Sequence, residues 1–180
     1  MPADTPSLDL AAALAVIGIG SNLGDRRATI EAAIETIAKL PGVELVARSS
    51  VWRTDPVGGP PQPDFYNAAV AVRCRMPLSG LMRELLGIEA RFGRVRGERN
   101  APRTLDLDLL WVEGQRLRLS EPDGLDLEVP HPRLHERAFA LVPLLEVVPG
   151  AADPTTGKLY ALLLAELGAE GVVPLDSSGA

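Results

Sequence analysis

Cysteine, lysine, histidine and aromatic residues are all scarce in this sequence. The single cysteine, Cys74, excludes an internal disulfide and a cysteine-based metal site, and such usage is typical of a reducing compartment. Cys74 lies in an alternating apolar segment, which predicts a buried strand residue and not a reactive thiol. The only lysines are Lys39 and Lys158, so a phosphate-binding site must rely on arginine. The planar guanidinium group suits that task because it donates two hydrogen bonds to one phosphate.

Long apolar runs are also absent, which argues against a membrane protein. Residues 13–19 form a short apolar stretch, and the acidic segment before it does not fit a secretory signal. With 180 residues, 46% of them hydrophobic and 23% charged, the chain has the composition of one globular domain. We expect a cytoplasmic monomer with an N-terminal extension (1–12), a single domain (13–167) and a loose C-terminal tail (168–180).

The net charge of −6 argues against nucleic-acid binding, yet one stretch of the chain is strongly basic. Five arginines and one acidic residue lie between positions 91 and 103, which gives a local charge of +4 (five minus one). A focused anion site is one interpretation of this stretch, and a solvated basic loop is the other. The arginines are Arg91, Arg94, Arg96, Arg99 and Arg103.

Hydrophobic spacing and turn residues predict a β-α-β-β-α-β order for the first part of the chain. Strands are expected at 13–19, 43–52, 65–74 and 104–112, and helices at 25–40 and 77–92. A hairpin strand at 116–119 and C-terminal helices at 134–147 and 158–167 follow. The first six elements match an α+β, ferredoxin-like fold with a mainly antiparallel sheet. Helices on one face of that sheet would leave the other face free for loops and a ligand.

Asp106 and Asp108 stand two residues apart in the last core strand. Alternate strand residues point to the same side, about 6.6 Å apart along the chain. Both carboxylates should therefore face away from the core that Leu105, Leu107 and Leu109 enter. Two like charges this close repel each other unless a cation lies between them, and Mg²⁺ suits such short oxygen ligands. The pair predicts a magnesium site, although Asp-x-Asp alone also fits the solvated face of a strand.

A second pattern of the same spacing, Asp126-Leu127-Glu128, serves as a comparison. It has no arginine cluster before it, and we interpret it as part of a solvated polar loop. Asp106 and Asp108 differ because Arg103 and the other arginines precede them directly. Metal ligands beside arginines form the pattern that a magnesium–polyphosphate complex needs.

Two further patterns carry less information. The run Gly18-Ile19-Gly20-Ser21-Asn22-Leu23-Gly24 has no lysine for a phosphate loop and misses the dinucleotide fingerprint by one residue. We interpret it as a strand-end turn whose Ser21 and Asn22 can line a pocket. His131 and His135 are four apart, but Pro132 separates them and no glutamate completes a zinc motif. His131 fits a phosphate donor and a surface turn equally well, and His135 should be exposed.

Taken together, several segments resemble the 6-hydroxymethyl-7,8-dihydropterin pyrophosphokinases of folate biosynthesis. They occur in the family's order over about residues 14–165. The segments are Ile19-Gly20-Ser21-Asn22-Leu23-Gly24, Arg53-Thr54 with Pro63-Asp64-Phe65-Tyr66-Asn67-Ala68-Ala69, Gly93-Arg94-Val95-Arg96, Pro102-Arg103-Thr104-Leu105-Asp106-Leu107-Asp108 and Val129-Pro130-His131-Pro132-Arg133. The resemblance implies that the hydroxymethyl oxygen of the pterin attacks the β-phosphorus of ATP and that AMP is released.

The resemblance also implies roles for individual residues, with ATP and the pterin as the partners. The catalytic residues would be Arg94, Arg103, Asp106 and Asp108, of which the two aspartates bind two Mg²⁺ ions. The nucleotide site would contain Glu89, Arg96, Leu109, His131 and Arg137. The pterin site would contain Thr54, Asp55, Val57, Phe65, Asn67 and Phe139. In that site the two phenylalanines would sandwich the ring, and Asn67 would hydrogen-bond to its edge.

The chain departs from the family's pattern at three positions. Some relatives carry a tryptophan where this chain has Asn100, the position of Pro132 can be tyrosine, and that of Asp55 is commonly apolar or proline. Two other functions remain open on the residues alone. A palm-type nucleotidyl transferase or cyclase also places paired aspartates on a ferredoxin-like sheet, and it releases pyrophosphate. A ligand-sensing module of the same fold would have no use for the arginine stretch beside the aspartates.

Overall fold

The computed structural model of the chain describes residues 12–95 and 101–177. The expected N-terminal extension lies outside the described residues except for residue 12, and Arg96, Arg99 and Asn100 lie outside them as well. Within the two described ranges, no helix has the length and apolar character needed to cross a membrane.

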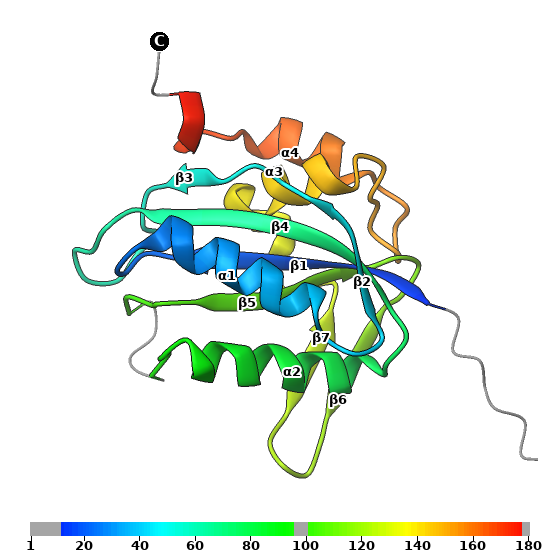
Figure 1. The fold of residues 1–180 in the computed structure, drawn as a ribbon. Helices are drawn as coiled ribbons and strands as arrows, with labels where there is room; N and C mark the ends of the chain where they lie inside the picture. Colours follow the sequence, from blue (N-terminus) through cyan, green and yellow to red (C-terminus); the bar gives the residue numbers. More distant parts are fainter. Residues whose placement is uncertain (1–11, 96–100, 178–180) are drawn as a thin grey trace, which may run out of the picture.

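A six-stranded sheet forms the centre of the domain (Figure 1). Its strands are β1 (Ala13–Ser21), β2 (Val43–Arg48), β3 (Trp52–Thr54), β4 (Phe65–Cys74), β5 (Asp106–Val112) and β8 (Val172–Pro174). They follow the order β5-β1-β4-β3-β8, and β2 also pairs with β4. Each pair of neighbouring strands is antiparallel. The predicted α+β, ferredoxin-like fold with a mainly antiparallel sheet is confirmed.

β1, which lies between β5 and β4, fixes the position of β5 and therefore of its two aspartates. Gly20 pairs with Asp106 and Gly18 with Asp108. The register shifts further along, where Leu110 lies between the paired residues Leu109 and Trp111. Because of this bulge, Leu109 enters the core on one face of the sheet and Trp111 the core on the other.

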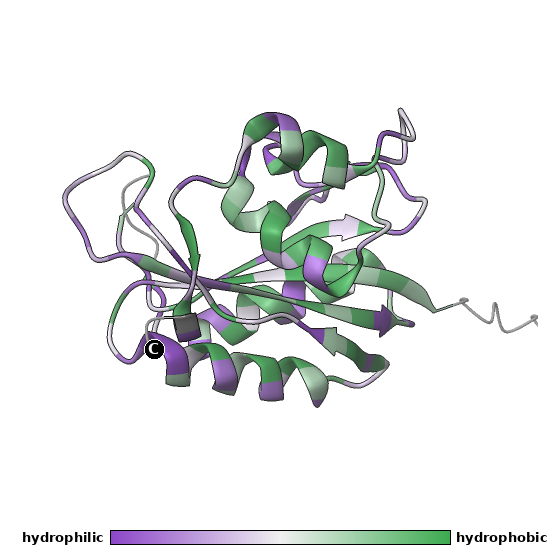
Figure 2. Ribbon diagram, turned by 90° about the horizontal axis from the view of Figure 1, so that it is seen from above, coloured by the Kyte–Doolittle hydropathy of each residue, from purple (hydrophilic) through white to green (hydrophobic). Residues whose placement is uncertain are grey.

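Helices α1 (Arg26–Ala38) and α2 (Leu78–Arg91) cover one face of the sheet, as predicted. The side chain of Asp25 caps α1 by accepting a hydrogen bond from the amide of Ala28 at 3.1 Å. Figure 2 shows hydrophobic and hydrophilic bands alternating along the helices, while the central strands are mainly hydrophobic. The helical residues that bury their side chains against the sheet include Ile30, Ile34, Ile37, Leu81, Leu85 and Ile88.

The second face of the sheet is not free, which corrects the sequence expectation. A short 3-10 helix, η1 (Leu134–Glu136), leads into α3 (Ala138–Val147), and α4 (Tyr160–Leu167) follows. Leu134, Leu141 and Leu144 pack there with Trp111 in a second hydrophobic cluster. The helical segment predicted at 134–147 is interrupted because Arg137 has an extended backbone. The ligand face is thus limited to the part of the sheet that these helices leave uncovered.

Three smaller expectations also need correction. The strand expected at 43–52 divides into β2 and β3. The hairpin strand β6 (Leu117–Ser120) pairs with β7 (Asp126–Val129) in a separate two-stranded sheet and not with β5. Asp126 and Glu128 are exposed as expected, but they lie on a strand and not in a loop.

The C-terminal tail was expected to be loose from residue 168, and this is wrong for 172–177. Val172–Pro174 form β8, which pairs with β3, and η2 (Leu175–Ser177) follows. Arg27 of α1 donates hydrogen bonds to both carboxylate oxygens of Asp176, at 2.9 and 3.1 Å. The amide of Leu175 also donates to the carbonyl of Val51 at 3.0 Å. These contacts hold the tail against the edge of the sheet.

Candidate active site

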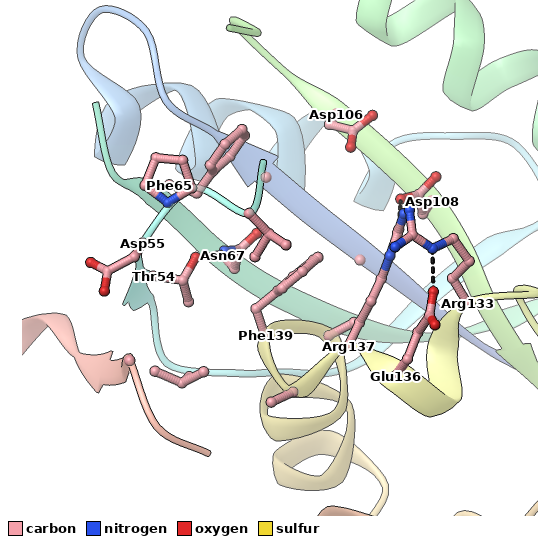
Figure 3. A pocket seen from close by; sticks show the side chains of 18 of the residues that line it. Thr54, Asp55, Phe65, Asn67, Asp106, Asp108, Arg133, Glu136, Arg137 and Phe139 are labelled. Atoms are coloured by element: carbon pink, nitrogen blue, oxygen red, sulfur yellow. Dashed lines mark hydrogen bonds and ion pairs between the residues drawn. The ribbon is translucent and has the colours of Figure 1, made fainter. Parts of the chain in front are cut away.

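A cavity of 870 Å³ lies over the uncovered part of the second face of the sheet. Its floor comes from β1, β4 and β5, and its walls come from the loop after β3, the start of α3 and residues 167–172. Figure 3 shows how the labelled side chains divide between its two ends. Phe65, Asn67 and Thr54 lie at one end, and Asp106 and Asp108 project from β5 at the other.

The two aspartates point to the same side of β5, as the strand period predicts. Leu105, Leu107 and Leu109 are buried in the core under α1 and α2, whereas Asp106 and Asp108 line the cavity. The sheet therefore holds two carboxylates at fixed positions on its solvent-accessible face. The prediction that both carboxylates face away from the core is therefore confirmed.

Asp106 is enclosed by two arginines. Arg94 donates a hydrogen bond to one carboxylate oxygen at 2.7 Å, and Arg103 donates to the other at 2.9 Å. Both arginine side chains are partly buried, at 20% and 29% exposure. Ion pairs in such an environment are stronger than on an open surface, because less solvent screens them. Two residues of the arginine stretch thus hydrogen-bond directly to the first aspartate in the folded structure.

Asp108 has a different environment. Its carboxylate lies 4.0 Å from the guanidinium group of Arg137, which reaches over from the start of α3 (Figure 3). Burial, reinforced by the charge of Asp106, raises the pKa of Asp108 to about 7. Burial also lowers the pKa of Arg137, although Asp108 opposes this effect. A partly buried carboxylate beside a second negative charge favours a cation as its partner.

Glu89 of α2 is connected to the two aspartates indirectly, through Arg94 and the backbone of Leu107. Its side chain is 6% exposed, and its carboxylate accepts a hydrogen bond from the amide of Leu107 at 2.7 Å and one from Arg94. Burial raises the pKa of Glu89, and the hydrogen bond from Leu107 opposes that effect. Neither Glu89 nor Arg94 is among the cavity-lining residues. Glu89 therefore anchors Arg94 and β5 to α2.

The other end of the cavity combines aromatic rings with a buried amide. Phe65 of β4 and Phe139 of α3 both line it, and Asn67 donates a hydrogen bond to the hydroxyl of Thr54 at 2.7 Å. Gly20 leaves room for this amide, because a Cβ atom there would lie 3.0 Å from Oδ1 of Asn67. An amide that both donates and accepts, placed between two rings, suits a flat heterocycle with a polar edge.

A second cavity of 380 Å³ opens on the other side of Asp108. The predicted nucleotide residues Leu109 and His131 line it, together with residues of α2, β6 and β7. His131 accepts a hydrogen bond from the amide of Arg133 at Nδ1, at 3.1 Å. Burial, followed by the charge of Arg137, lowers the pKa of His131 to about 4. The imidazole is therefore neutral at neutral pH, and His135 is exposed as expected.

The structure brings most of the predicted site residues together. Ten of them line the first cavity, namely Thr54, Asp55, Val57, Phe65, Asn67, Arg103, Asp106, Asp108, Arg137 and Phe139. Arg94 and Glu89 are not among these lining residues: Arg94 donates to Asp106, and Glu89 accepts from the amide of Leu107 in β5. Arg96 lies outside the described residues. Asp108 is shared by both cavities.

Several lining residues were missed by sequence reasoning. Gln62, Arg133, Glu136 and the tail residues 167–172 contribute to the first cavity. Arg133 forms an ion pair with Glu136, as Figure 3 shows. Arg133 belongs to a segment that resembles the family, and its positive charge two residues after His131 could have indicated a place in the anion site. No local pattern in 167–172 indicated a contact with residues more than a hundred positions earlier.

The acidic pair alone would offer a metal ion few ligands. Among the described residues, no group of three or more His, Cys, Asp or Glu side chains is arranged to hold a metal ion. Two carboxylates on one strand suit an ion that takes its other ligands from water and from phosphate oxygens, which is the habit of Mg²⁺. The donor set therefore fits magnesium bound together with a polyphosphate better than a protein-only metal site.

Comparison with known proteins connects this geometry to one family. Residues 16–149 match the family described as 7,8-dihydro-6-hydroxymethylpterin-pyrophosphokinase (HPPK). Two proteins named 2-amino-4-hydroxy-6-hydroxymethyldihydropteridine pyrophosphokinase are similar over most of their length. The one from Synechocystis sp. is 38% identical over 89% of this chain and 80% of its own. The one from Methylorubrum extorquens is 40% identical over 88% of this chain and 96% of its own.

Solved structures support the fold. A Plasmodium falciparum HPPK-DHPS triple mutant with SDX-DHP has a TM-score of 0.65 and 15% identity, and the match covers 89% of this chain and 45% of that chain. An HPPK-DHPS in complex with substrates has a TM-score of 0.65 and 13% identity, over 87% of this chain and 43% of that chain. This chain thus spans less than half the length of these two proteins, and the likeness concerns the fold.

Proposed function

We infer the roles of the site residues from one premise: the chain belongs to the 7,8-dihydro-6-hydroxymethylpterin-pyrophosphokinase family. It transfers pyrophosphate from ATP to the hydroxymethyl group of 6-hydroxymethyl-7,8-dihydropterin, giving the pterin diphosphate and AMP in tetrahydrofolate biosynthesis. Asp108 lies at the junction of the two cavities, and this placement carries the proposal that follows.

The pterin would occupy the end of the first cavity that Phe65, Asn67 and Phe139 line. The two rings can hold a flat heterocycle between them, and the amide of Asn67 can both donate to and accept from its amide-like edge. The backbone beside Thr54, Asp55 and Val57 supplies further donors and acceptors on the same wall. The hydroxymethyl group would then point along the cavity toward the aspartates.

The nucleotide would place its base in the second cavity, beside Leu109 and His131, and its phosphates beside Asp108. Arg137 lies 4.0 Å from Asp108 and can contact the same phosphates. Neutral His131 can donate a single hydrogen bond there, because its Nδ1 already accepts one from Arg133. Arg96, which the family resemblance assigns to the nucleotide, lies outside the described residues.

Two Mg²⁺ ions would be held by Asp106 and Asp108, with their remaining ligands supplied by phosphate oxygens and water. When bound, the ions neutralise the charge of the polyphosphate and help to align it. In this structure Arg94 and Arg103 occupy the carboxylate oxygens of Asp106. Binding of the ions would therefore redirect both arginines from Asp106 to the phosphates.

The chemical step forms one bond and breaks one. The hydroxymethyl oxygen attacks the β-phosphorus, the bond from that phosphorus to the bridging oxygen breaks, and AMP leaves with the electron pair. Arg94 and Arg103 would stabilise the charge on the transferred group and the leaving oxygen. The hydroxyl proton would pass to the carboxylate of Asp106, which is the candidate for contacting the hydroxyl, and from there to water.

One assay tests the reaction against both rival functions. Purified protein is incubated with MgATP and the hydroxymethyl pterin, and AMP and pyrophosphate are measured separately. Pterin-dependent formation of AMP is expected. Release of pyrophosphate would favour a palm-type transferase or cyclase, and pterin binding without turnover would favour a ligand-binding module. AMP formation that does not require the pterin would also contradict the proposal.

The dependence on magnesium is tested in the same assay by adding a chelator and then restoring the ion. Turnover should disappear and return, and pterin binding alone should change little because the aromatic end of the cavity lies away from the aspartates. The cytoplasmic location and the monomeric state that we expect from the sequence stay predictions. Fractionation of cells and light scattering of the purified protein would test them.

A further inference from the structure

Asn22, directly after β1, is a buried amide that none of the roles above uses. It is 1% exposed, and its neighbour Ser21 ends the strand. Sequence reasoning marked Asn22 only as a residue that could line a pocket. In the structure its side chain contacts two segments that lie far apart in sequence.

The first segment is the loop between β3 and β4, which forms the wall of the pterin end. Nδ2 of Asn22 donates to Oε1 of Gln62 at 2.7 Å and to the carbonyl of Pro63 at 3.1 Å. Gln62 itself lines the first cavity, and Phe65 follows Pro63 by two residues. The two donors of one amide thus hold the loop at the point where it returns to the sheet.

The second segment leads into β5 and carries Arg103. Oδ1 of Asn22 accepts a hydrogen bond from the amide of Arg103 at 2.8 Å, and the amide of Asn22 donates to the carbonyl of Arg103 at 3.1 Å. Arg103 is therefore held through both of its backbone polar groups. Its side chain is then in place to donate to Asp106 at 2.9 Å.

We propose that Asn22 is a positioning residue that fixes the pterin loop and the backbone of Arg103 relative to each other. This proposal rests on the proposed function, because it assigns the loop to the pterin and Arg103 to the phosphates. Transfer between two bound substrates depends on their relative position, so a residue that links the two walls affects the chemical step without contacting either substrate.

The chemistry of the position makes the test sharp. Asparagine offers two donors and an acceptor, and all of these groups are used. Aspartate has the same shape and keeps the acceptor for Arg103, but it has no donors. It would oppose the fixed carbonyl of Pro63 with a carboxylate oxygen, and the amide of Gln62 would have to turn to donate to it. Asn22→Asp should therefore release the loop more than the arginine.

The experiment compares Asn22→Asp, Asn22→Ala and Gln62→Ala with the wild type at a temperature at which all are folded. Asn22→Asp is expected to raise the KM for the pterin about tenfold and to lower kcat, with a smaller change in the KM for ATP. Asn22→Ala loses both sets of contacts and should have a still lower kcat. Gln62→Ala removes one of the two loop acceptors of Nδ2 and leaves both hydrogen bonds between Asn22 and Arg103, so it should raise the KM for the pterin and lower kcat less than Asn22→Ala does.

Ser49→Ala is the matched control for the loss of a buried hydrogen bond. Ser49 is 5% exposed, accepts from the amide of Ala69 at 2.8 Å and does not line either cavity. It should lower the melting temperature without changing kcat or either KM. If Asn22→Asp behaves in the same way, Asn22 only stabilises the fold and the proposal is overturned.

Hydrogen–deuterium exchange gives a readout that does not depend on turnover. In Asn22→Ala, peptides covering 60–66 and 101–107 should both exchange faster, and in Gln62→Ala only the first should. Unchanged exchange at 101–107 in Asn22→Ala would overturn the proposal. If Asn22→Asp does not fold, the KM for the pterin in Gln62→Ala decides: an unchanged value would overturn the proposal. If the wild type gives no pterin-dependent AMP, the proposed function fails, and exchange still reports on Asn22.

Discussion

Asp106 and Asp108 lie on the same face of β5, but their carboxylates have different partners. Asp106 accepts hydrogen bonds from Arg94 at 2.7 Å and from Arg103 at 2.9 Å, whereas Asp108 lies 4.0 Å from Arg137. One carboxylate is thus paired with two arginines, and the other is partly buried beside a more distant cation. The two positions should respond differently to the same substitution.

Asp108→Asn should abolish turnover and stabilise the protein in magnesium-free buffer. The substitution removes a partly buried carboxylate that repels Asp106. Two charges about 6.6 Å apart at an effective dielectric constant of 20 repel by about 2.5 kcal/mol. Loss of the contact with Arg137 offsets part of this. Urea unfolding at pH 8 should therefore show a free energy of unfolding about 1 kcal/mol higher than that of the wild type.

Pterin affinity should be almost unchanged in Asp108→Asn, because the aromatic end of the cavity lies away from it (Figure 3). Asp25→Asn is the control, since asparagine caps a helix as well as aspartate and Asp25 is remote from both cavities. A loss of stability in Asp108→Asn would indicate that this aspartate supports the fold and would weaken its assignment as a metal ligand.

Gly20→Ala should weaken pterin binding by about tenfold, or about 1.4 kcal/mol. The added Cβ would lie 3.0 Å from Oδ1 of Asn67, so the amide has to move. Calorimetric titration with the pterin measures the effect directly. Gly87→Ala in α2 is the control, because its Cβ would meet no atom within 4 Å and alanine favours a helix. It should bind normally and gain about 0.5–1 kcal/mol in stability.

A chain that ends at Leu167 should bind the pterin about tenfold more weakly than a chain that ends at Ser177. The shorter chain lacks β8 and the residues of 168–172 that line the first cavity, whereas no tail residue lines the second. Nucleotide binding should be unaffected, which distinguishes the loss of one wall from general unfolding. Equal pterin affinity in both chains would show that the tail covers the sheet edge without contributing to the site.

His131 should make the wild-type protein less stable in mild acid. Its pKa in the folded state is about 4, below the unfolded value of 6.5, so between these pH values only the unfolded chain takes up the proton. The free energy of unfolding therefore falls as the pH falls through this window. At pH 5 the loss is about 1–2 kcal/mol, given 1.36 kcal/mol per pKa unit.

Urea unfolding of the wild type and His131→Gln at pH 7.5 and pH 5 checks this expectation. The variant has no titrating group at this position, so its stability should fall less between the two pH values. Parallel pH dependence in both proteins would mean that the folded protein also protonates His131 above pH 5.

The sequence predicts the parts of the fold that have a clear hydrophobic period. The strands β1, β4 and β5 and both core helices appear close to their expected positions, because each buries a regular face in one core. The strands β7 and β8 were missed. β7 has only four residues, in which the buried Leu127 and Val129 alternate with two exposed acidic residues, too short a pattern to separate from a polar loop. β8 is a three-residue edge strand that includes Pro174, which fits only an edge.

The sequence predicts those features of the site that depend on neighbouring residues or on a recognised motif. The common face of Asp106 and Asp108 follows from the period of two, and the pterin-side residues Phe65 and Asn67 came from the family resemblance. Contacts across long stretches of chain could not be predicted in this way. Glu89 meets the amide of Leu107, 18 positions later, and Asn22 meets Gln62, 40 positions later. The packing of α2 against β5 brings the first pair together, and the pairing of β1 with β4 brings the second together.

The position of Asp108 in the wall of both cavities has a thermodynamic consequence. One substrate can stabilise a particular arrangement of the Asp108 carboxylate and Arg137. The other substrate then binds to a cavity whose wall already has that arrangement. If bound nucleotide changes the affinity for the pterin by some factor, the pterin must change the affinity for nucleotide by the same factor. The two binding equilibria are linked through one side chain, and neither affinity is a fixed property of its own cavity.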